Sequence, residues 1–260
     1  MKDRKKKEMK QRDKLARDYD GLISEYQHRV EISSVVKKLD PREEEYILDS
    51  GCGTGRITYK LIESGCKVVT VDFSKESLKV CKQRCSTLSN PHLYLIRADV
   101  CNLPLKDCFF DKCVSSEVLE HIPSEKERLR MLRETHRVLK LNGKLVLTTY
   151  NYSLRKIIGR KRETKNSDLY AYRYDYFKLK KIISFIFRGK IKILGILNLI
   201  HWLHPNVLNK FERFCIPIDN FIEITPFSYL LAHLLLVECK KISDELISNK
   251  EDSFYDRKTL

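Results

Sequence analysis

The residues best suited to chemistry lie in a glycine-rich stretch, Asp49-Ser-Gly51-Cys-Gly53-Thr-Gly55. Glycines at alternate positions let the backbone approach a ligand closely, because a side chain there would stand between the two. Asp72 follows Gly51 by 21 positions, where a carboxylate can accept hydrogen bonds from ribose hydroxyls. The spacing therefore predicts a site for a ligand that contains a nucleoside, and these residues alone would also suit a dinucleotide.

Three further features favour a positively charged sulfonium methyl donor over a dinucleotide. The glycines are spaced G-x-G-x-G, whereas the dinucleotide fingerprint is G-x-G-x-x-G. Asp49 precedes them, and a carboxylate there can hold an ammonium group directly or through water but would repel a pyrophosphate. Asp99, in Ala98-Asp99-Val100, ends a third apolar run and can accept a hydrogen bond from an adenine amino group.

The segment Glu117-Val-Leu-Glu120-His121 holds a second group of candidate residues. On a helical turn, its two carboxylates and its imidazole would share one face. They could then bind a divalent metal, or His121 alone could act as a general base toward the methyl acceptor. The third interpretation, that His121 only caps or orients its loop, is the one we favour. We expect no metal, and we keep His121 as the catalytic candidate.

Alternating strand and helix patterns place these residues along one edge of a sheet. Apolar runs predict strands at 46–50, 67–72, 92–99, 110–116 and 144–150, with helices at 56–64, 77–88 and 124–139 between them. Such alternation implies βαβ units and a parallel sheet. Ligands of parallel sheets bind at the carboxyl ends of the strands, which is where the glycines, Asp72 and Asp99 fall.

The chain on either side departs from this alternation. Residues 1–14 are expected to be a disordered basic arm, and 15–39 predict one or two amphipathic helices. After residue 150 we expect a basic loop at 151–170, a helix at 175–187, a strand at 190–200, an irregular aromatic segment at 201–226 and a strand at 230–240. The resulting division is an arm at 1–14, one domain at 15–242 with a basic, aromatic substrate-side region at 151–228, and a polar tail at 243–260.

Four stretches resemble, in the same order, the class I family of S-adenosylmethionine-dependent methyltransferases. They look closest to its branch of ubiquinone- and menaquinone-biosynthesis enzymes. The stretches are ILDSGCGTGRIT (47–58), VVTVDFS (68–74), IRADVCNLPLKDCFFDKCVSSEVLEHI (96–122) and RETHRVLKLNGKLVLTTYN (133–151). The resemblance implies an α/β, Rossmann-like, doubly wound fold. Its mostly parallel seven-stranded sheet would have an antiparallel last strand, a helical N-terminal cap and an insertion before that strand.

The resemblance also implies S-adenosylmethionine as co-substrate and a set of donor-binding residues. That set is Asp49, Gly51, Gly53, Gly55, Asp72, Phe73, Asp99, Val100 and Glu117. In the family's arrangement, the glycines would cradle the amino-acid and ribose parts of the donor. Asp72 would hold the ribose, Asp99 with the Val100 amide would hold the adenine, and Glu117 would face the sulfur end.

Charge and composition bear on partners and location. Residues 1–14 and 153–192 carry net charges of +5 and +10, which together account for the +15 of the whole chain. Such segments attract the phosphates of RNA or of an anionic membrane surface, or are simply solvated. The N-terminus lacks the apolar run of a secretory signal, and the nine cysteines form no C-x-x-C pair. We expect a cytoplasmic protein with reduced thiols.

The function expected from the sequence is methyl transfer by in-line displacement to an oxygen or carbon of a small-molecule or lipid-like acceptor. Peripheral contact with an anionic membrane surface would suit such an acceptor. Two alternatives stay open: an RNA methyltransferase that uses the basic segments, with nucleic acid as a less favoured partner, and a non-catalytic scaffold of the same fold.

Overall fold

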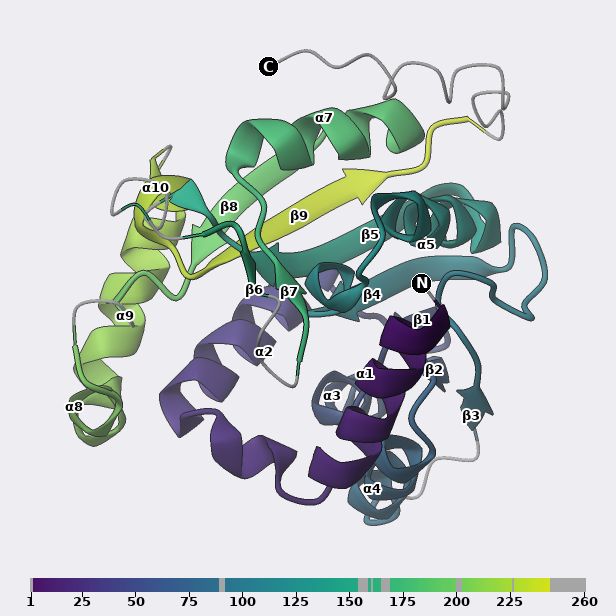
Figure 1. Cartoon of the computed structure of the whole chain (residues 1–260), viewed down its shortest axis with the longest axis horizontal. Coiled ribbons are helices and arrows are strands. Elements are labelled where there is room, and N and C mark those ends of the chain that lie inside the picture. Colours follow the sequence, from purple (N-terminus) through teal and green to yellow (C-terminus); the bar gives the residue numbers. More distant parts are fainter. Residues whose placement is uncertain are drawn as a thin grey trace.

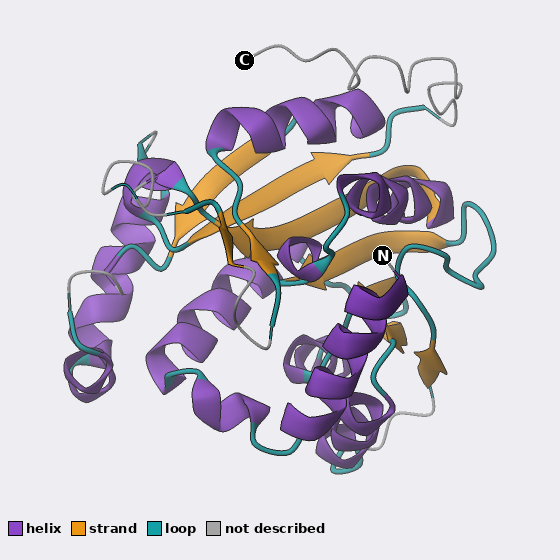
Figure 2. Cartoon of the chain, in the orientation of Figure 1, coloured by secondary structure: helices purple, strands orange, loops and turns teal. Residues whose placement is uncertain are grey.

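A computed structural model describes residues 2–88, 92–153, 159, 161–164, 169–199, 203–225 and 227–243. Its centre is a seven-stranded sheet with the strand order β3-β2-β1-β4-β5-β9-β8. The strands are β1 (Tyr46–Ser50), β2 (Lys67–Asp72), β3 (Leu93–Arg97), β4 (Phe110–Ser116), β5 (Leu139–Tyr150), β8 (Lys192–Ile196) and β9 (Leu234–Lys240). Helices cover both faces of this sheet (Figures 1 and 2).

Strand pairing confirms the doubly wound fold expected from the sequence. β1 pairs in parallel with β2 and β4, β2 with β3, and β4 with β5. The last strand, β9, is antiparallel to both of its neighbours, β5 and β8. Because β9 reverses direction between them, β8 runs the same way as β5. The sheet is therefore parallel except for β9.

The helices that pack on the sheet follow from its two apolar faces. Neighbouring residues of β1 point to opposite faces, so that Leu48 joins the core beneath one layer of helices and Ile47 the core beneath the other. The first layer contains α5 (Glu125–Val138) and α7 (Tyr176–Phe187); the second contains α2 (Glu25–Leu39), α3 (Arg56–Glu63) and α4 (Lys75–Cys85). Each parallel strand ends at the carboxyl edge of the sheet, and the helix that follows it returns the chain to the amino edge.

The N-terminal segment differs from its prediction. Residues expected to be disordered form helix α1 (Lys2–Leu15), followed by the short 3-10 helix η1 (Tyr19–Leu22). The sequence shows no apolar spacing here because polar contacts hold α1 in place. Lys5 pairs with Asp99, and Ser74 Oγ donates to Asp13 Oδ1 over 2.6 Å. The helix lies across the carboxyl edge of the sheet (Figure 1).

The segment before the last strand also differs. Residues 201–226 were expected to be irregular, but the described part forms α8 (Pro205–Lys210) and α9 (Glu212–Glu223). The final strand begins at Leu234 rather than at residue 230, because Ser228–Leu231 form the short helix α10. The described part of the basic loop predicted at 151–170 contains the short strand β6 (Glu163–Thr164), which pairs with β7 (Ala171–Tyr172) just beyond it. The predicted tail beyond residue 243 lies outside the described residues.

Among the described helices, none is long and apolar enough to cross a membrane.

Candidate active site

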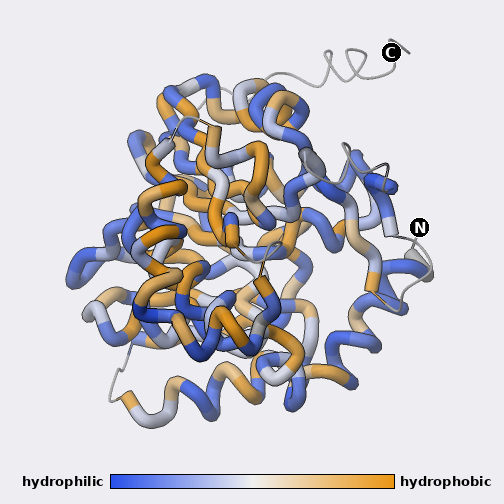
Figure 3. The backbone as a smooth tube through the Cα atoms, turned by 90° about the vertical axis from the view of Figure 1, so that its left-hand side faces the viewer, coloured by the Kyte–Doolittle hydropathy of each residue, from blue (hydrophilic) through white to orange (hydrophobic). Residues whose placement is uncertain are grey.

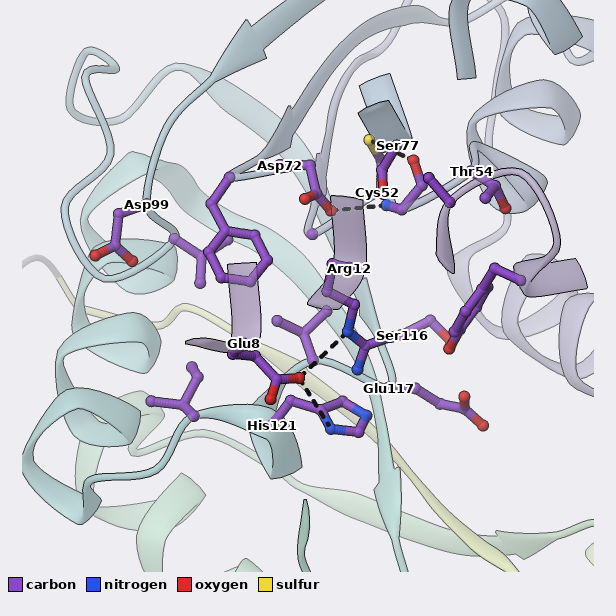
Figure 4. A pocket seen from close by; sticks show the side chains of 18 of the residues that line it. Glu8, Arg12, Cys52, Thr54, Asp72, Ser77, Asp99, Ser116, Glu117 and His121 are labelled. Atoms are coloured by element: carbon purple, nitrogen blue, oxygen red, sulfur yellow. Dashed lines mark hydrogen bonds and ion pairs between the residues drawn. The ribbon is translucent and has the colours of Figure 1, made fainter. Parts of the chain in front are cut away.

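A pocket opens at the carboxyl edge of the sheet and collects most of the residues singled out from the sequence (Figure 4). It encloses about 950 Å³, including the part open to solvent. The loop after β1 supplies one wall, the residues that follow β2, β3 and β4 supply others, and α1 lies over it. Of the predicted donor-binding residues, those that line the pocket are Gly51, Gly53, Asp72, Phe73, Asp99, Val100 and Glu117.

The three glycines after β1 serve two different purposes. All three have positive φ angles, of 84°, 52° and 81° for Gly51, Gly53 and Gly55. A Cβ atom on Gly51 would lie 2.4 Å from Val118 Cγ2, and one on Gly55 would lie 2.5 Å from Cys81 Sγ. These two glycines are therefore required by packing. A Cβ on Gly53 would meet no described atom within 4 Å, so Gly53 is the one whose bare backbone is available to a ligand.

Asp72 is fixed by the loop that it faces. Its Oδ2 accepts a hydrogen bond from Gly53 N over 2.9 Å, and its Oδ1 accepts one from Ser74 N over 2.8 Å. Burial raises the pKa of this carboxyl group. Each oxygen retains a further lone pair, so the carboxylate can still accept hydrogen bonds from two neighbouring hydroxyls.

Asp99 lies at the opposite end of the pocket from the glycine loop (Figure 4). Its Oδ1 accepts a hydrogen bond from Cys101 N over 2.9 Å, and its Oδ2 pairs with Lys5 of α1. Lys5 Nζ also lies 3.7 Å from Glu127. The carboxylate predicted to meet an adenine amino group thus has a cationic partner in this structure.

Glu117 is a buried carboxylate with an unused oxygen. Its backbone is left-handed, with a φ of 52°, and its amide donates to Thr148 Oγ1 over 3.1 Å. Oε1 has no hydrogen-bond partner among the described residues. Burial, followed by the charges of Glu31 and Glu120, raises its pKa well above the ordinary range. A buried acceptor in this state is suited to a cationic ligand, which would favour its ionised form.

His121 lines the pocket, and its two ring nitrogens have different surroundings. Nδ1 lies 2.7 Å from the carbonyl oxygen of Tyr170. Burial and the nearby Arg12 hold the pKa of His121 well below its usual range, so the ring is neutral and Nδ1 donates its proton to that carbonyl. Nε2 then carries a lone pair, and no described residue bonds to it.

Part of the chain is similar in sequence to known proteins. Residues 48–147 match a family described as "Methyltransferase domain". The chain is 36% identical over 138 residues to demethylmenaquinone methyltransferase of Staphylococcus epidermidis, covering 51% of this chain and 55% of that protein. It is 32% identical over 149 residues to 2-phytyl-1,4-beta-naphthoquinone methyltransferase of Arabidopsis thaliana, covering 54% and 56%. Residues 48–147 therefore resemble a methyltransferase domain. The chain matches just over half the length of these curated relatives.

Solved structures show the same fold. One is an S-adenosylmethionine-dependent methyltransferase of Thermotoga maritima, described as a possible histamine N-methyltransferase. It aligns with a TM-score of 0.63 and 20% identity over 88% of this chain and 97% of that one. Phosphoethanolamine N-methyltransferase 2 of Haemonchus contortus aligns with a TM-score of 0.58 and 16% identity, over 82% and 52%.

Two of the predicted donor-binding residues do not line the pocket. Gly55 faces Cys81, as described above. Asp49 is only 2% exposed and accepts a hydrogen bond from Thr58 Oγ1 over 2.6 Å. Burial raises the pKa of Asp49 to about 7. In the structure both residues hold the loop after β1 in shape, and neither lines the pocket.

The prediction that Glu117, Glu120 and His121 share a helical face is wrong. The left-handed backbone at Glu117 places it before the 3-10 helix η2 (Leu119–His121) and breaks the helical spacing. Glu120 is fully buried and accepts a hydrogen bond from Thr149 Oγ1 over 3.1 Å. Within the described residues, no group of three or more His, Cys, Asp or Glu side chains is arranged to hold a metal ion.

Two arginines of the pocket were missed by the sequence analysis. Arg56 begins α3, its Nη1 lies 3.6 Å from Glu31 Oε2, and that nitrogen has no hydrogen-bond partner among the described residues. Arg12 of α1 reaches the same pocket and is held by Glu8, with 3.3 Å between Nε and Oε1. The position of Arg56 directly after the glycines was a usable signal. Arg12 had only its i,i+4 spacing from Glu8, in a segment assumed to be disordered.

Proposed function

We propose that this chain transfers the methyl group of S-adenosylmethionine to a ring carbon or oxygen of a hydroxylated, quinone-type small molecule. The observation that carries the proposal is the pocket that combines Gly53, Asp72, Asp99 and Glu117 at the carboxyl edge of the sheet. The acceptor class is supported by the names of the relatives, which act on demethylmenaquinone and phytylnaphthoquinone.

Two neighbouring carboxylates would hold the nucleoside part of the donor. Asp99 would accept a hydrogen bond from the adenine amino group, and the Val100 amide N–H would donate one to the adenine ring. Asp72 would accept hydrogen bonds from the ribose hydroxyls beside Phe73, because two backbone amides already orient its oxygens. Gly53 allows the backbone to pass close to the donor.

The amino-acid part of the donor is a zwitterion, and the pocket offers partners for both of its charges. The unpaired oxygen of buried Glu117 suits the ammonium group and the nearby sulfonium. Arg56, whose Nη1 has no hydrogen-bond partner among the described residues, and Arg12 suit the carboxylate. Opposite charges in one pocket therefore fix the direction in which the donor lies.

His121 would take the proton of the acceptor. As the acceptor hydroxyl gives its proton to Nε2, its oxygen or the adjacent ring carbon forms the bond to the methyl carbon. The carbon–sulfur bond breaks, its electron pair stays on sulfur, and S-adenosylhomocysteine leaves. Where carbon attacks, the displaced ring proton goes to water. The low pKa of His121 keeps Nε2 unprotonated at neutral pH before each turnover.

The proposal is tested by turnover with a methyl-labelled donor and chemically reduced naphthoquinones with an apolar tail. Mass spectrometry should find one labelled methyl on the ring, and NMR should tell carbon from oxygen. His121→Gln should lower kcat by about 10² to 10⁴ and leave the affinity for S-adenosylhomocysteine unchanged. The matched control is His92→Gln at the amino end of β3. Labelling of bulk tRNA instead of the quinol, or labelling of neither by a chain that binds the donor, would contradict the proposed acceptor.

A further inference from the structure

Helix α9 is amphipathic in the opposite sense to an ordinary surface helix. Its buried positions, Cys215, Asp219 and Glu223, follow a four-residue spacing, and two of them are acids. Tyr26 Oη of α2 donates to Asp219, and Ser34 Oγ donates to Glu223 Oε2 over 2.9 Å. The polar face of α9 is therefore the one that packs against the protein.

The outward side of α9 is apolar. Helical spacing places Phe211, Phe214, Ile218 and Phe221 on one face, and Ile224 and Phe227 extend it toward α10. Each of these six side chains, which we call the outer face, is between 46% and 68% exposed. Figure 3 views the molecule from this side, and much of the tube facing the viewer is coloured as hydrophobic. Contiguous apolar side chains of this size mark an interaction surface.

The charges that flank the outer face are positive. Lys210 Nζ lies 5.6 Å from the Phe211 ring centre, and the Arg213 guanidinium lies 4.7 Å from that of Phe214. Glu212, the acid between them, is engaged by Arg29 Nη1 over 2.8 Å. With Asp219 and Glu223 turned inward, the outer face combines exposed aromatic rings with basic groups. That combination matches the acyl boundary and the anionic headgroups of a lipid bilayer.

The outer face lies at the same edge of the sheet as the donor pocket. Helices α8, α9 and α10 connect the carboxyl end of β8 with the start of β9. Because β8 runs in the same direction as β1 and β4, its carboxyl end lies at the edge where the pocket opens. Helix α2 packs against α8 and α9 and lies between them and α1 (Figure 1).

We propose that the outer face docks this protein on an anionic lipid bilayer. The aromatic and aliphatic side chains of α9 insert at the headgroup boundary, while Lys210 and Arg213 meet lipid phosphates. Docking places the pocket edge of the sheet toward the bilayer. This inference concerns binding to lipid and does not depend on the acceptor that is methylated.

The test is co-sedimentation of the full chain with vesicles of phosphatidylcholine alone or of equimolar phosphatidylcholine and phosphatidylglycerol. We expect binding to the anionic vesicles that weakens with salt. Phe214→Ser with Phe221→Ser should reduce it about tenfold or more. The matched control is Tyr94→Ser with Leu141→Ser, which removes two comparably exposed side chains from β3 and β5.

The charge requirement is tested separately by Lys210→Glu with Arg213→Glu, which should also lower the affinity about tenfold or more. Lys79→Glu with Lys82→Glu, on the exposed side of α4, makes the same charge change elsewhere. Binding of S-adenosylhomocysteine should be unchanged in every variant, which shows that each one folds. The proposal is overturned if the anionic vesicles do not bind the wild type, or if both pairs of serine substitutions act equally. It is also overturned if the outer face instead joins two copies, so that ultracentrifugation shows a dimer that the α9 serine pair dissolves.

Discussion

At the scale of single residues, the pocket combines buried carboxylates, such as Glu117, with the guanidinium groups of Arg12 and Arg56. Glu117 and Arg56 each keep an atom without a hydrogen-bond partner among the described residues. Leaving such groups unpaired in a buried site costs about 1–3 kcal/mol each. A zwitterionic ligand that satisfies both would recover this cost, which is why we assign the amino-acid part of the donor to them.

This assignment predicts a selective loss of affinity. Arg56→Gln should weaken binding of S-adenosylhomocysteine about tenfold or more, because it removes a charged partner of the carboxylate. Binding of 5′-methylthioadenosine, which lacks the amino-acid part, should hardly change. Calorimetry with both ligands measures the difference, and Lys60→Gln on the exposed side of α3 is the control. An equal loss for both ligands would show that Arg56 serves the fold or the nucleoside instead.

Asp49 predicts a pH dependence of stability. Its pKa is raised by burial from 3.8 to about 7, so the folded chain holds this proton more tightly than the unfolded chain. The contribution of this protonated carboxyl group to the stability of the fold is fully present below about pH 3.8 and is lost as pH rises to about 7. Asp49→Asn cannot titrate but can still accept from Thr58. Between about pH 4 and pH 8, the free energy of unfolding of the wild type should fall by about 1–3 kcal/mol more than that of Asp49→Asn.

Denaturant unfolding across this pH range measures the effect. Asp107→Asn, at an exposed carboxylate, is the control. If the free energy of unfolding falls equally with pH in the wild type and in Asp49→Asn, Asp49 is ionised in the folded chain.

At the scale of elements, the strands and most helices of the sheet domain were predictable, whereas α1, α8 and α9 were not. β1 and β2 are buried on both faces and appear in the sequence as short apolar runs. By contrast, α1 is held by ion pairs, which leave no spacing to detect. In α9 the apolar side chains face outward and Pro217 lies inside the helix, so its pattern resembles an irregular aromatic loop.

The candidate site was predictable to the extent that it follows from strand ends. Asp72, Asp99 and Glu117 all line the pocket because each ends a parallel strand or lies within two residues of its end. Helical spacing wrongly predicted a face shared by Glu117, Glu120 and His121, because the left-handed backbone of Glu117 breaks that spacing. Arg12 could not be predicted at all without the position of α1.

The position of α1 predicts how the donor enters. Lys5 pairs with the carboxylate that would bind the adenine amino group, so the two compete. Lys5→Gln should therefore tighten binding of S-adenosylhomocysteine by about threefold to tenfold, a modest change because the pair is partly exposed. Stopped-flow or calorimetric titration measures it, with the neighbouring exposed Lys6→Gln as control. Weaker binding in Lys5→Gln would instead make Lys5 a donor-binding residue.

At the scale of the whole molecule, the positive charge is partly used within the fold. In the basic region, Arg162 pairs with Asp175 over 2.7 Å, and Arg173 donates to Thr164 Oγ1 over 2.7 Å. The N-terminal basic segment packs over the pocket as α1. We therefore place the proposed membrane contact on α9, and no observation on the described residues favours the RNA alternative. The cytoplasmic location stays a prediction.

The central claim, a donor site built on the carboxyl edge of the sheet, is tested most directly by calorimetry with S-adenosylhomocysteine. The wild type should bind with micromolar affinity. Asp72→Ala should weaken binding about tenfold or more, because it removes a charged acceptor for the ribose hydroxyls. Asp107→Ala, at an exposed carboxylate, should bind like the wild type. Absence of binding to the wild type, or equal binding by Asp72→Ala, would contradict the claim.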